Sequence, residues 1–257
     1  MMKLKNKVAI VTGSALGIGK SEAELFAKEG AKVVVSDILD EEGEKVAEGI
    51  KKNGGDCFYA HLDISNAKDW DDVVSRTLSE YGQIDILLNN ATVFGPSNNP
   101  MGTNQDLSEE DWNKVMEINV KGIFLGTKRC IPEMIKNKKG SIINTCSSSA
   151  TFGQLGVVPV YNASKGAIRS YTRSLAVEYG SEGIRVNSIS PGPIKTRMNL
   201  ELIKNEGTSE RIQKRVALRR AGDPIEVAQG AVFLASDDAS FVTGADLVID
   251  GGLTIHG

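Results

Sequence analysis

A phenol and an ammonium group stand four residues apart in the stretch YNASK, which runs from Tyr161 to Lys165. In a helix this spacing places both side chains on one face, so that their polar ends can meet at a common point. A free phenol, with a pKa of about 10, is a poor base near neutral pH, and a nearby ammonium group would lower that pKa by stabilising the phenolate. We therefore interpret the pair as a candidate proton-transfer site, the alternative being an ordinary solvated helix face.

The composition of the chain limits the classes of partner that we expect. The 257 residues are 40% apolar and 25% charged, which is sufficient for one sizeable core. Lys and Arg number 30 against 33 Asp and Glu, so the formal charge of -3 predicts no nucleic-acid or membrane-surface partner. No apolar run approaches the roughly 18 residues of a membrane-spanning helix, and the start MMKLKNKVAIVTG shows no signal cleavage site. We therefore expect a cytoplasmic protein.

The cysteine and histidine residues predict neither a disulfide framework nor a metal site. Cys57, Cys130 and Cys146 are odd in number and widely spaced, which is typical of reduced thiols in a reducing compartment. With only His61 and His256 in the chain, we expect no metal centre built from histidines.

Short apolar, β-branched runs alternate with longer segments of helical spacing along the whole chain. Such runs are typical of strands that are covered on both faces, and the alternation predicts crossover units on a parallel sheet. No linker, repeat or low-complexity tract divides residues 1–257, so we predict an α/β fold with one doubly wound domain and helices on both faces. The interval 195–225, polar and rich in Arg and Lys, is either a surface excursion or a cover over the substrate pocket. The predicted strands are KVAIVTG, KVVVSD, DCFYAHLD, IDILLNNA, GSIINTCS, IRVNSIS and ADLVIDG.

A glycine cluster lies between the first predicted strand and the helix that follows it. In TGSALGIG, Gly13, Gly17 and Gly19 permit a tight turn and a close approach of the backbone to a phosphate, while the helix N-terminus offers unpaired N–H groups. Asp37 closes the next strand, where a carboxylate can accept hydrogen bonds from an adenosine ribose. Together these features predict a dinucleotide site, and the acidic residue favours NAD over NADP.

With TGSALGIG, LLNNA, YNASK and SPGPIKT in view, the sequence resembles the short-chain dehydrogenase/reductase family along essentially its whole length. The resemblance implies a seven-stranded Rossmann-type sheet, a nicotinamide cofactor and oxidoreductase activity on a secondary alcohol or its ketone. It also implies a homotetramer with two-fold axes. The catalytic residues that it implies are Asn119, Ser148, Tyr161 and Lys165.

Ser148 is one of three adjacent serines, and the family's usual separation from the tyrosine selects it, whereas periodicity alone excludes neither Ser147 nor Ser149. By resemblance Asn119 holds a helix irregularity and a water of a proton relay. The family commonly has glycine after NNA, where this chain has Thr92. The cofactor contacts that the motifs imply are Gly13, Leu16, Gly17, Ile18, Gly19, Asp37, Asp63, Ile64, Asn90, Tyr161, Lys165, Ile194 and Thr196.

Three functions remain open at this stage. The first is an NAD-dependent alcohol dehydrogenase that acts on a small molecule, for which Phe152, Leu155, Val157 and Met198 suggest an apolar pocket. The second is a 3-oxoacyl thioester reductase that docks an acidic carrier protein on basic residues. The third, of another class, is a non-catalytic dinucleotide sensor, which the fold alone does not exclude. The basic residues considered for docking are Arg129, Lys136, Lys138 and Lys139.

Overall fold

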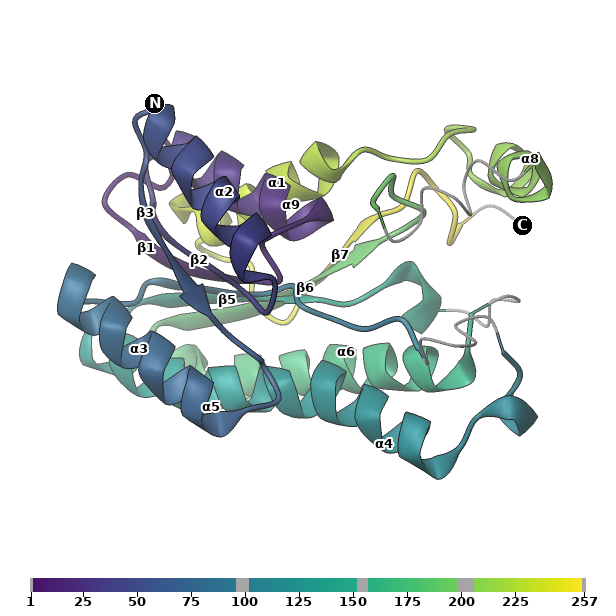
Figure 1. Cartoon of the computed structure of the whole chain (residues 1–257), viewed down its shortest axis with the longest axis horizontal. Coiled ribbons are helices and arrows are strands. Elements are labelled where there is room, and N and C mark those ends of the chain that lie inside the picture. Colours follow the sequence, from purple (N-terminus) through teal and green to yellow (C-terminus); the bar gives the residue numbers. More distant parts are fainter. Residues whose placement is uncertain (1, 96–101, 152–156, 198–205, 256–257) are drawn as a thin grey trace.

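The computed structural model describes residues 2–95, 102–151, 157–197 and 206–255 (Figure 1). Seven strands form one sheet in the order β3-β2-β1-β4-β5-β6-β7, and neighbouring strands are parallel throughout. Six of the seven predicted apolar runs contain one of these strands, and the run IRVNSIS covers all of β6 except Pro191, so the predicted fold class is confirmed. The strands are β1 Val8–Thr12, β2 Lys32–Asp37, β3 Asp56–His61, β4 Ile86–Asn89, β5 Gly140–Thr145, β6 Ile184–Pro191 and β7 Asp246–Ile249.

Helices cover both faces of the sheet (Figure 1). The upper layer in that view holds α1 Gly17–Lys28, α2 Asp40–Lys52 and α9 Pro224–Ala235. The lower layer holds α3 Ala67–Tyr81, α4 Glu109–Met116, α5 Gly122–Lys136 and α6 Pro159–Tyr179. The remaining helix, α8 Glu206–Arg215, lies apart from both layers at one end of the molecule. Short elements are the 3-10 turns Asn104–Asp106, Ser148–Ala150, Gly180–Glu182 and Asp237–Ala239, and the π-helical turn Glu117–Lys121.

Alternate residues of each buried strand contribute to two separate cores. On β1, Ala9 and Val11 belong to the cluster that contains Phe26 of α1, whereas Ile10 belongs to the cluster that contains Trp70 of α3. The near-continuous apolar runs of the strands follow from this burial on both sides. The strand order reverses direction between β1 and β4, and a crevice opens at the carboxyl ends of the strands at such a point.

Several properties predicted from composition can be compared with the described part of the chain. Cys57, Cys130 and Cys146 are all buried free thiols. The described helices include none with the length and apolar character needed to cross a membrane. No group of three or more His, Cys, Asp or Glu side chains in the described ranges is arranged to hold a metal ion.

One carboxylate of α1 is buried without a partner. Glu22 is fully buried, and neither oxygen of its carboxylate has a hydrogen-bond partner. Burial favours the neutral form and raises its pKa from an ordinary value of 4.5 to about 8. Glu22 lies four residues before the buried Phe26, on the same face of the helix, and the packing of α1 against α9 and the sheet leaves it in the interior.

The burial of Glu22 predicts a pH-dependent stability. A group whose pKa is higher in the folded state than in the unfolded state stabilises the folded state fully at pH values below its unfolded pKa. This stabilisation is lost as the pH rises toward the folded pKa. Between about pH 5 and 8 this carboxylate should therefore lower the unfolding free energy of the wild type by about 1.4 kcal/mol per pH unit. Urea unfolding across this range should show that the unfolding free energy of Glu22→Gln rises steadily relative to that of the wild type. Glu24→Gln, a change at an exposed neighbour, is the control, and a gap that stays constant with pH for Glu22→Gln would contradict the assignment.

Candidate active site

A cleft of about 780 Å³ runs along the carboxyl edge of the sheet. It contains residues that follow β1, β2, β3, β4, β5 and β6, which the parallel order brings to one edge. Of the predicted residues, Gly19 and Asn119 are not among those that line it. The predicted residues that line it are Gly13, Leu16, Gly17, Ile18, Asp37, Asp63, Ile64, Asn90, Ser148, Tyr161, Lys165, Ile194 and Thr196.

The glycine loop brings the backbone close to the cleft and leaves donors at the start of α1. Gly13 has φ of +65°, and a Cβ there would lie 2.7 Å from the Cα of Ala91. A Cβ on Gly19 would lie 2.2 Å from the carbonyl oxygen of Gly13, so this glycine closes the loop from behind instead of lining the cleft. Leu16 precedes the helix and makes no side-chain cap, so the first N–H groups of α1 face the cleft without an internal acceptor.

Asp37 is fixed at the end of β2 by two backbone donors. Its Oδ2 accepts the N–H of Ala15 at 3.0 Å and its Oδ1 accepts the N–H of Leu39 at 3.1 Å. Each oxygen keeps acceptor capacity for another donor, such as a ribose hydroxyl. Tyr59 secures the same connection, because its hydroxyl donates to the Asp37 carbonyl and to Asp40, both at 2.7 Å.

The segment after β4 is tied to the glycine loop. Asn90 Nδ2 donates to the carbonyls of Thr12 and Gly13, each at 3.1 Å, and the Thr12 hydroxyl accepts the N–H groups of Asn90 and Ala91. The Asn90 amide thus supports the loop, and its predicted contact with a ribose stays a prediction. Thr92, where the family commonly has glycine, lines the cleft with a buried hydroxyl that lacks a hydrogen-bond partner.

The β3 end of the cleft is ordered by a short turn and by packing. Asp63 Oδ1 accepts the N–H of Ser65 at 2.9 Å and its hydroxyl at 2.7 Å. Ile64 packs against Gly122 of α5, where a Cβ would lie 2.7 Å from Ile64 Cδ1. Both residues therefore hold defined positions on the cleft wall.

Tyr161 and Lys165 occupy the first two turns of α6, as the sequence predicts. Pro159 begins the helix, and Tyr161 stacks against Phe94 with ring centroids 4.7 Å apart. Lys165 is only 1% exposed, and its Nζ donates to the carbonyl of Thr145 at 2.7 Å. The ammonium group lies 5.5 Å from the centroid of the Tyr161 ring. The pair therefore shares one face of the helix, with the ammonium held by the end of β5.

The electrostatics of the pair differ from the sequence-based expectation. Burial raises the pKa of Tyr161, and a hydrogen bond from Ser147 opposes that rise without cancelling it. Burial also lowers the pKa of Lys165 to about 8. The expected lowering of the phenol pKa is not found, because loss of solvent destabilises the phenolate more than its neighbours stabilise it. At neutral pH the phenol in this structure is protonated.

The three serines after β5 have different surroundings. Ser147 caps the 3-10 turn Ser148–Ala150, and its oxygen accepts from the Ser149 N–H at 3.2 Å and from the Ser149 hydroxyl at 2.8 Å. Ser147 is also the serine whose hydroxyl opposes the rise in the pKa of Tyr161 that burial causes. Ser148, selected by the family's separation, lines the cleft and is 3% exposed. Periodicity left Ser147 open beside Ser148, and its effect on the pKa of Tyr161 makes Ser147 a second candidate, while the selection of Ser148 stays a prediction.

Asn119 does not line the cleft but supports its wall through hydrogen bonds. It lies in the π-helical turn Glu117–Lys121, an irregularity often found at functional sites. Its Oδ1 accepts the Val93 N–H at 2.9 Å, and its Nδ2 donates to the Val93 carbonyl at 2.9 Å and to Ser164 Oγ at 3.1 Å. The side chain thus joins the segment after β4 to α6, and its predicted role in a proton relay stays a prediction.

The far end of the cleft is bounded by α8 and by the segment that precedes α6. Val157 lines the cleft, as predicted for an apolar pocket, whereas Phe152, Leu155 and Met198 lie outside the described residues. The side chains of α8 that reach the cleft were not singled out from the sequence, although the interval 195–225 was predicted to lie near the substrate.

The residues present fit a nicotinamide dinucleotide. The glycine loop offers backbone N–H groups at a helix N-terminus, where a pyrophosphate is stabilised, and Asp37 offers acceptors at the position of an adenosine ribose. Ile194 and Thr196 follow β6 on the same wall as Tyr161 and Lys165. The cleft therefore combines a dinucleotide cradle with a candidate proton-transfer pair.

Comparisons with known proteins agree with this combination of fold and site. A family model described as Enoyl-(Acyl carrier protein) reductase matches residues 13–254. Cyclopentanol dehydrogenase of Comamonas sp. (strain NCIMB 9872) is 40% identical over the full length of both chains. The 3-alpha-(or 20-beta)-hydroxysteroid dehydrogenase of Mycobacterium bovis is 39% identical over 97% of this chain and 90% of its own.

A solved structure shows the same architecture. A gluconate 5-dehydrogenase from Burkholderia cenocepacia, in complex with NADP and tartrate, superposes with a TM-score of 0.92 at 30% identity and covers 98% of this chain and 97% of its own. Fold and cleft define an oxidoreductase of the doubly wound, nicotinamide-binding class. The chain belongs to the short-chain dehydrogenase/reductase family.

The contact between Ser147 and the phenol predicts which serine matters more for turnover. Ser147→Ala should lower kcat by about tenfold or more, because the hydroxyl beside the Tyr161 oxygen is lost, whereas Ser148→Ala should have a smaller effect. Ser147→Thr, which keeps a hydroxyl, should restore part of the rate. Steady-state rates of NADH oxidation with a ketone measure all three, and a larger loss in Ser148→Ala would favour the serine that the family's spacing selects.

Proposed function

We propose that this chain is an NAD-dependent dehydrogenase that interconverts a secondary alcohol and a ketone, with Tyr161 as the general acid and base. The observation that carries the proposal is that Tyr161 and Lys165 line the same cleft as the glycine loop. The relatives named as dehydrogenases of cyclopentanol and of hydroxysteroids support a secondary alcohol as the substrate.

Hydride and proton have separate carriers in this proposal. The nicotinamide, when bound, supplies or accepts the hydride. In ketone reduction the Tyr161 hydroxyl gives its proton to the carbonyl oxygen, and the raised pKa of the phenol keeps that proton available at neutral pH. In alcohol oxidation the phenol must first lose its proton, so that the phenolate can accept the proton of the alcohol.

Two further side chains orient the reaction. The Ser147 hydroxyl, which opposes the rise in the pKa of the phenol, would hold the substrate oxygen beside Tyr161. The Lys165 ammonium, fixed on the Thr145 carbonyl, supplies positive charge near the ring and a donor for the nicotinamide ribose. Asn119 acts on Tyr161 indirectly, because its Nδ2 donates to Ser164 Oγ at 3.1 Å and Ser164 Oγ donates to the Tyr161 carbonyl at 2.7 Å.

The alternative of a carrier-dependent thioester reductase receives little support from the basic residues considered for docking. Arg129 pairs with Asp71, Lys136 with Glu133 and Lys139 with Asp237. Residues 136–139 precede β5, so they lie at the amino edge of the sheet, opposite the cleft. A carrier bound there would be on the wrong side to deliver an acyl chain. A non-catalytic sensor is distinguished from an enzyme by turnover alone.

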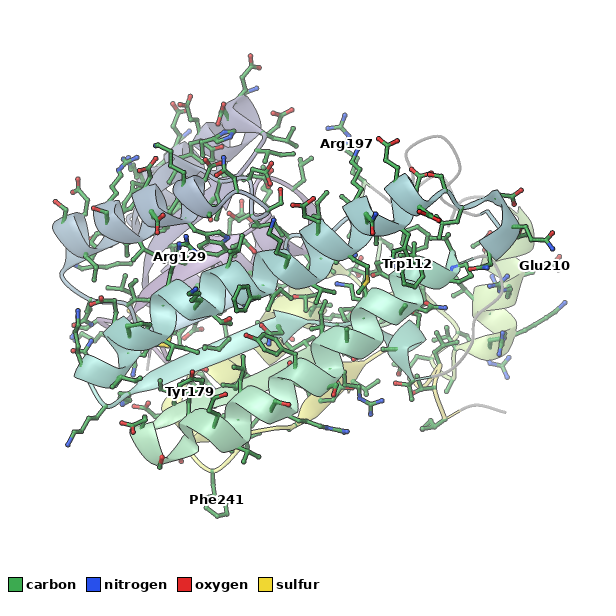
Figure 2. All side chains as sticks on the ribbon, turned by 90° about the horizontal axis from the view of Figure 1, so that it is seen from below. Trp112, Arg129, Tyr179, Arg197, Glu210 and Phe241 are labelled. Carbon is green, nitrogen blue, oxygen red and sulfur yellow. The ribbon has the colours of Figure 1, made fainter. Side chains whose placement is uncertain are left out.

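We also propose that the chain forms a homotetramer, a state that light scattering reports directly. Large apolar side chains are exposed on three elements: Phe124 on α5, Val177 on α6 and Val248 on β7. Phe241, which is fully exposed, projects alone from the ribbon at the bottom of Figure 2. Contact with other copies of the chain would bury such surface.

Replacement of Tyr161 tests the proposed reaction. Tyr161→Phe should lower kcat about a hundredfold or more while NADH binding changes by less than about twofold, because only the transferable proton is lost. Tyr171→Phe, which removes a phenol from the same helix outside the cleft, is the matched control. Retention of more than about a tenth of the wild-type rate, a barrier increase below about 1.4 kcal/mol, would exclude Tyr161 as the principal acid and base.

Cofactor choice provides a second test. We expect a roughly fivefold to hundredfold preference for NAD(H) over NADP(H), because a 2′-phosphate would meet the like charge of Asp37, which lines the cleft. Lys20, the nearest cation in sequence, is exposed on α1 near Glu24, 3.8 Å away. Asp37→Asn should reduce the ratio of kcat/KM with NAD(H) to kcat/KM with NADP(H), while Glu41→Gln should leave this ratio unchanged. Equal efficiencies with both cofactors in the wild type would show that Asp37 does not face the ribose.

A further inference from the structure

An aromatic side chain to which the proposed reaction gives no role lies against the phenol ring of Tyr161. The ring of Phe94, in the segment after β4, has its centroid 4.7 Å from that of Tyr161, and the two ring planes meet at 40°. This separation is typical of aromatic side chains in direct packing contact. Both residues line the cleft and both are half-buried, so the two rings form one part of its wall.

A chain of hydrogen bonds joins the backbone segments that carry the two rings. The buried Asn119 side chain accepts the Val93 N–H and donates to the Val93 carbonyl, both at 2.9 Å, and so fixes the backbone directly before Phe94. The same side chain donates to Ser164 Oγ at 3.1 Å, and Ser164 Oγ donates to the Tyr161 carbonyl at 2.7 Å. The contact between the two rings is therefore built into the fold.

The polar groups around the Tyr161 phenol come from α6 and from the end of β5. Lys165 Nζ on α6 lies 5.5 Å from the centroid of the phenol ring. The Cys146 thiol and the Ser147 hydroxyl, which follow β5, act on the pKa of the phenol in opposite directions. Phe94 brings neither charge nor a polar group, so it can act on the hydroxyl only by packing and by excluding water. The buried apolar cluster against which Tyr161 also packs consists of Val115, Val158 and Val160.

We infer that Phe94 is a positioning residue that fixes the Tyr161 ring and keeps water from its hydroxyl. The inference deepens the proposed function and rests on it, because Tyr161 is the acid and base there. Loss of water destabilises a phenolate more than a neutral phenol, so the Phe94 ring adds to the burial that raises the pKa of Tyr161. Removal of the ring should let water reach the hydroxyl and stabilise the phenolate.

Titration of the phenol tests the inference without any substrate. The ultraviolet difference spectrum between a protein and its Tyr161→Phe counterpart reports the phenolate of Tyr161 alone. At a fixed alkaline pH, the phenolate fraction should be at least about tenfold higher in Phe94→Ala than in the wild type, because its pKa should fall by at least about one unit. Alcohol oxidation with NAD should reach its plateau at a correspondingly lower pH in the same variant.

Three further variants separate exclusion of water from loss of packing. Phe94→Leu keeps an apolar side chain and should raise the phenolate fraction by less than about threefold. Phe94→Gln fills much of the same space with a polar side chain and should act as Phe94→Ala does, so the test remains available if the alanine variant does not fold. Phe241→Ala, a change at a fully exposed phenylalanine, should leave the phenolate fraction unchanged.

A phenolate fraction within about twofold of the wild type in folded Phe94→Ala and Phe94→Gln would overturn the inference. An equal rise in Phe241→Ala would also overturn it, because the effect would then be a general loosening of the protein. Full turnover by Tyr161→Phe would overturn the proposed function instead. The titration needs no turnover, so it would still show whether Phe94 shields the phenol.

Discussion

The burial of the Lys165 ammonium group is the constraint on which the site depends. A charge that is 1% exposed is costly unless it is bonded, and here the Thr145 carbonyl at the end of β5 accepts its hydrogen bond at 2.7 Å. This bond links α6 to the sheet and sets the height of Tyr161 above the strand ends. The phenol is then close enough to Ser147, two residues after Thr145, for the Ser147 hydroxyl to affect its pKa.

The parallel sheet converts this local arrangement into a site. Every strand ends at the same edge, so Asp37, the glycine loop, Asn90, Ser147 and Ile194 meet although they are distant in sequence. The hydrogen bonds that hold them are mostly from side chain to backbone, as with Asn90 on Gly13 and Asn119 on Val93. Such bonds fix the loops without using the groups that face the cleft.

Much of this arrangement could be predicted from the sequence because it depends on patterns that act locally. The apolar runs identified all seven strands, and the tyrosine and lysine spacing identified the face of α6. The choice between Ser147 and Ser148 does not follow from periodicity, because a 3-10 turn rotates successive side chains in ways that spacing does not encode, and the selection of Ser148 stays a prediction. The predicted direction of the Tyr161 pKa shift was also wrong, because the sequence shows a nearby cation but not how far the folded chain excludes solvent from the phenol. Glu22 illustrates the same limit, because its spacing from Phe26 shows that they share a helix face but not that its carboxylate is fully buried without a partner.

The π-helical turn Glu117–Lys121 sets the rotation of α5 about the helix axis relative to α4. One extra residue in a helical turn rotates everything beyond it by about 100° relative to an uninterrupted α-helix. Val115 is the one described α4 residue that is buried, whereas α5 buries a full stripe that includes Ile123, Ile131 and Met134. The insertion turns the stripe of α5 onto the sheet and leaves α4 rotated away from it. A deletion of one residue here would restore the regular hydrogen-bond ladder and, by the same rotation, misdirect Asn119 away from Val93.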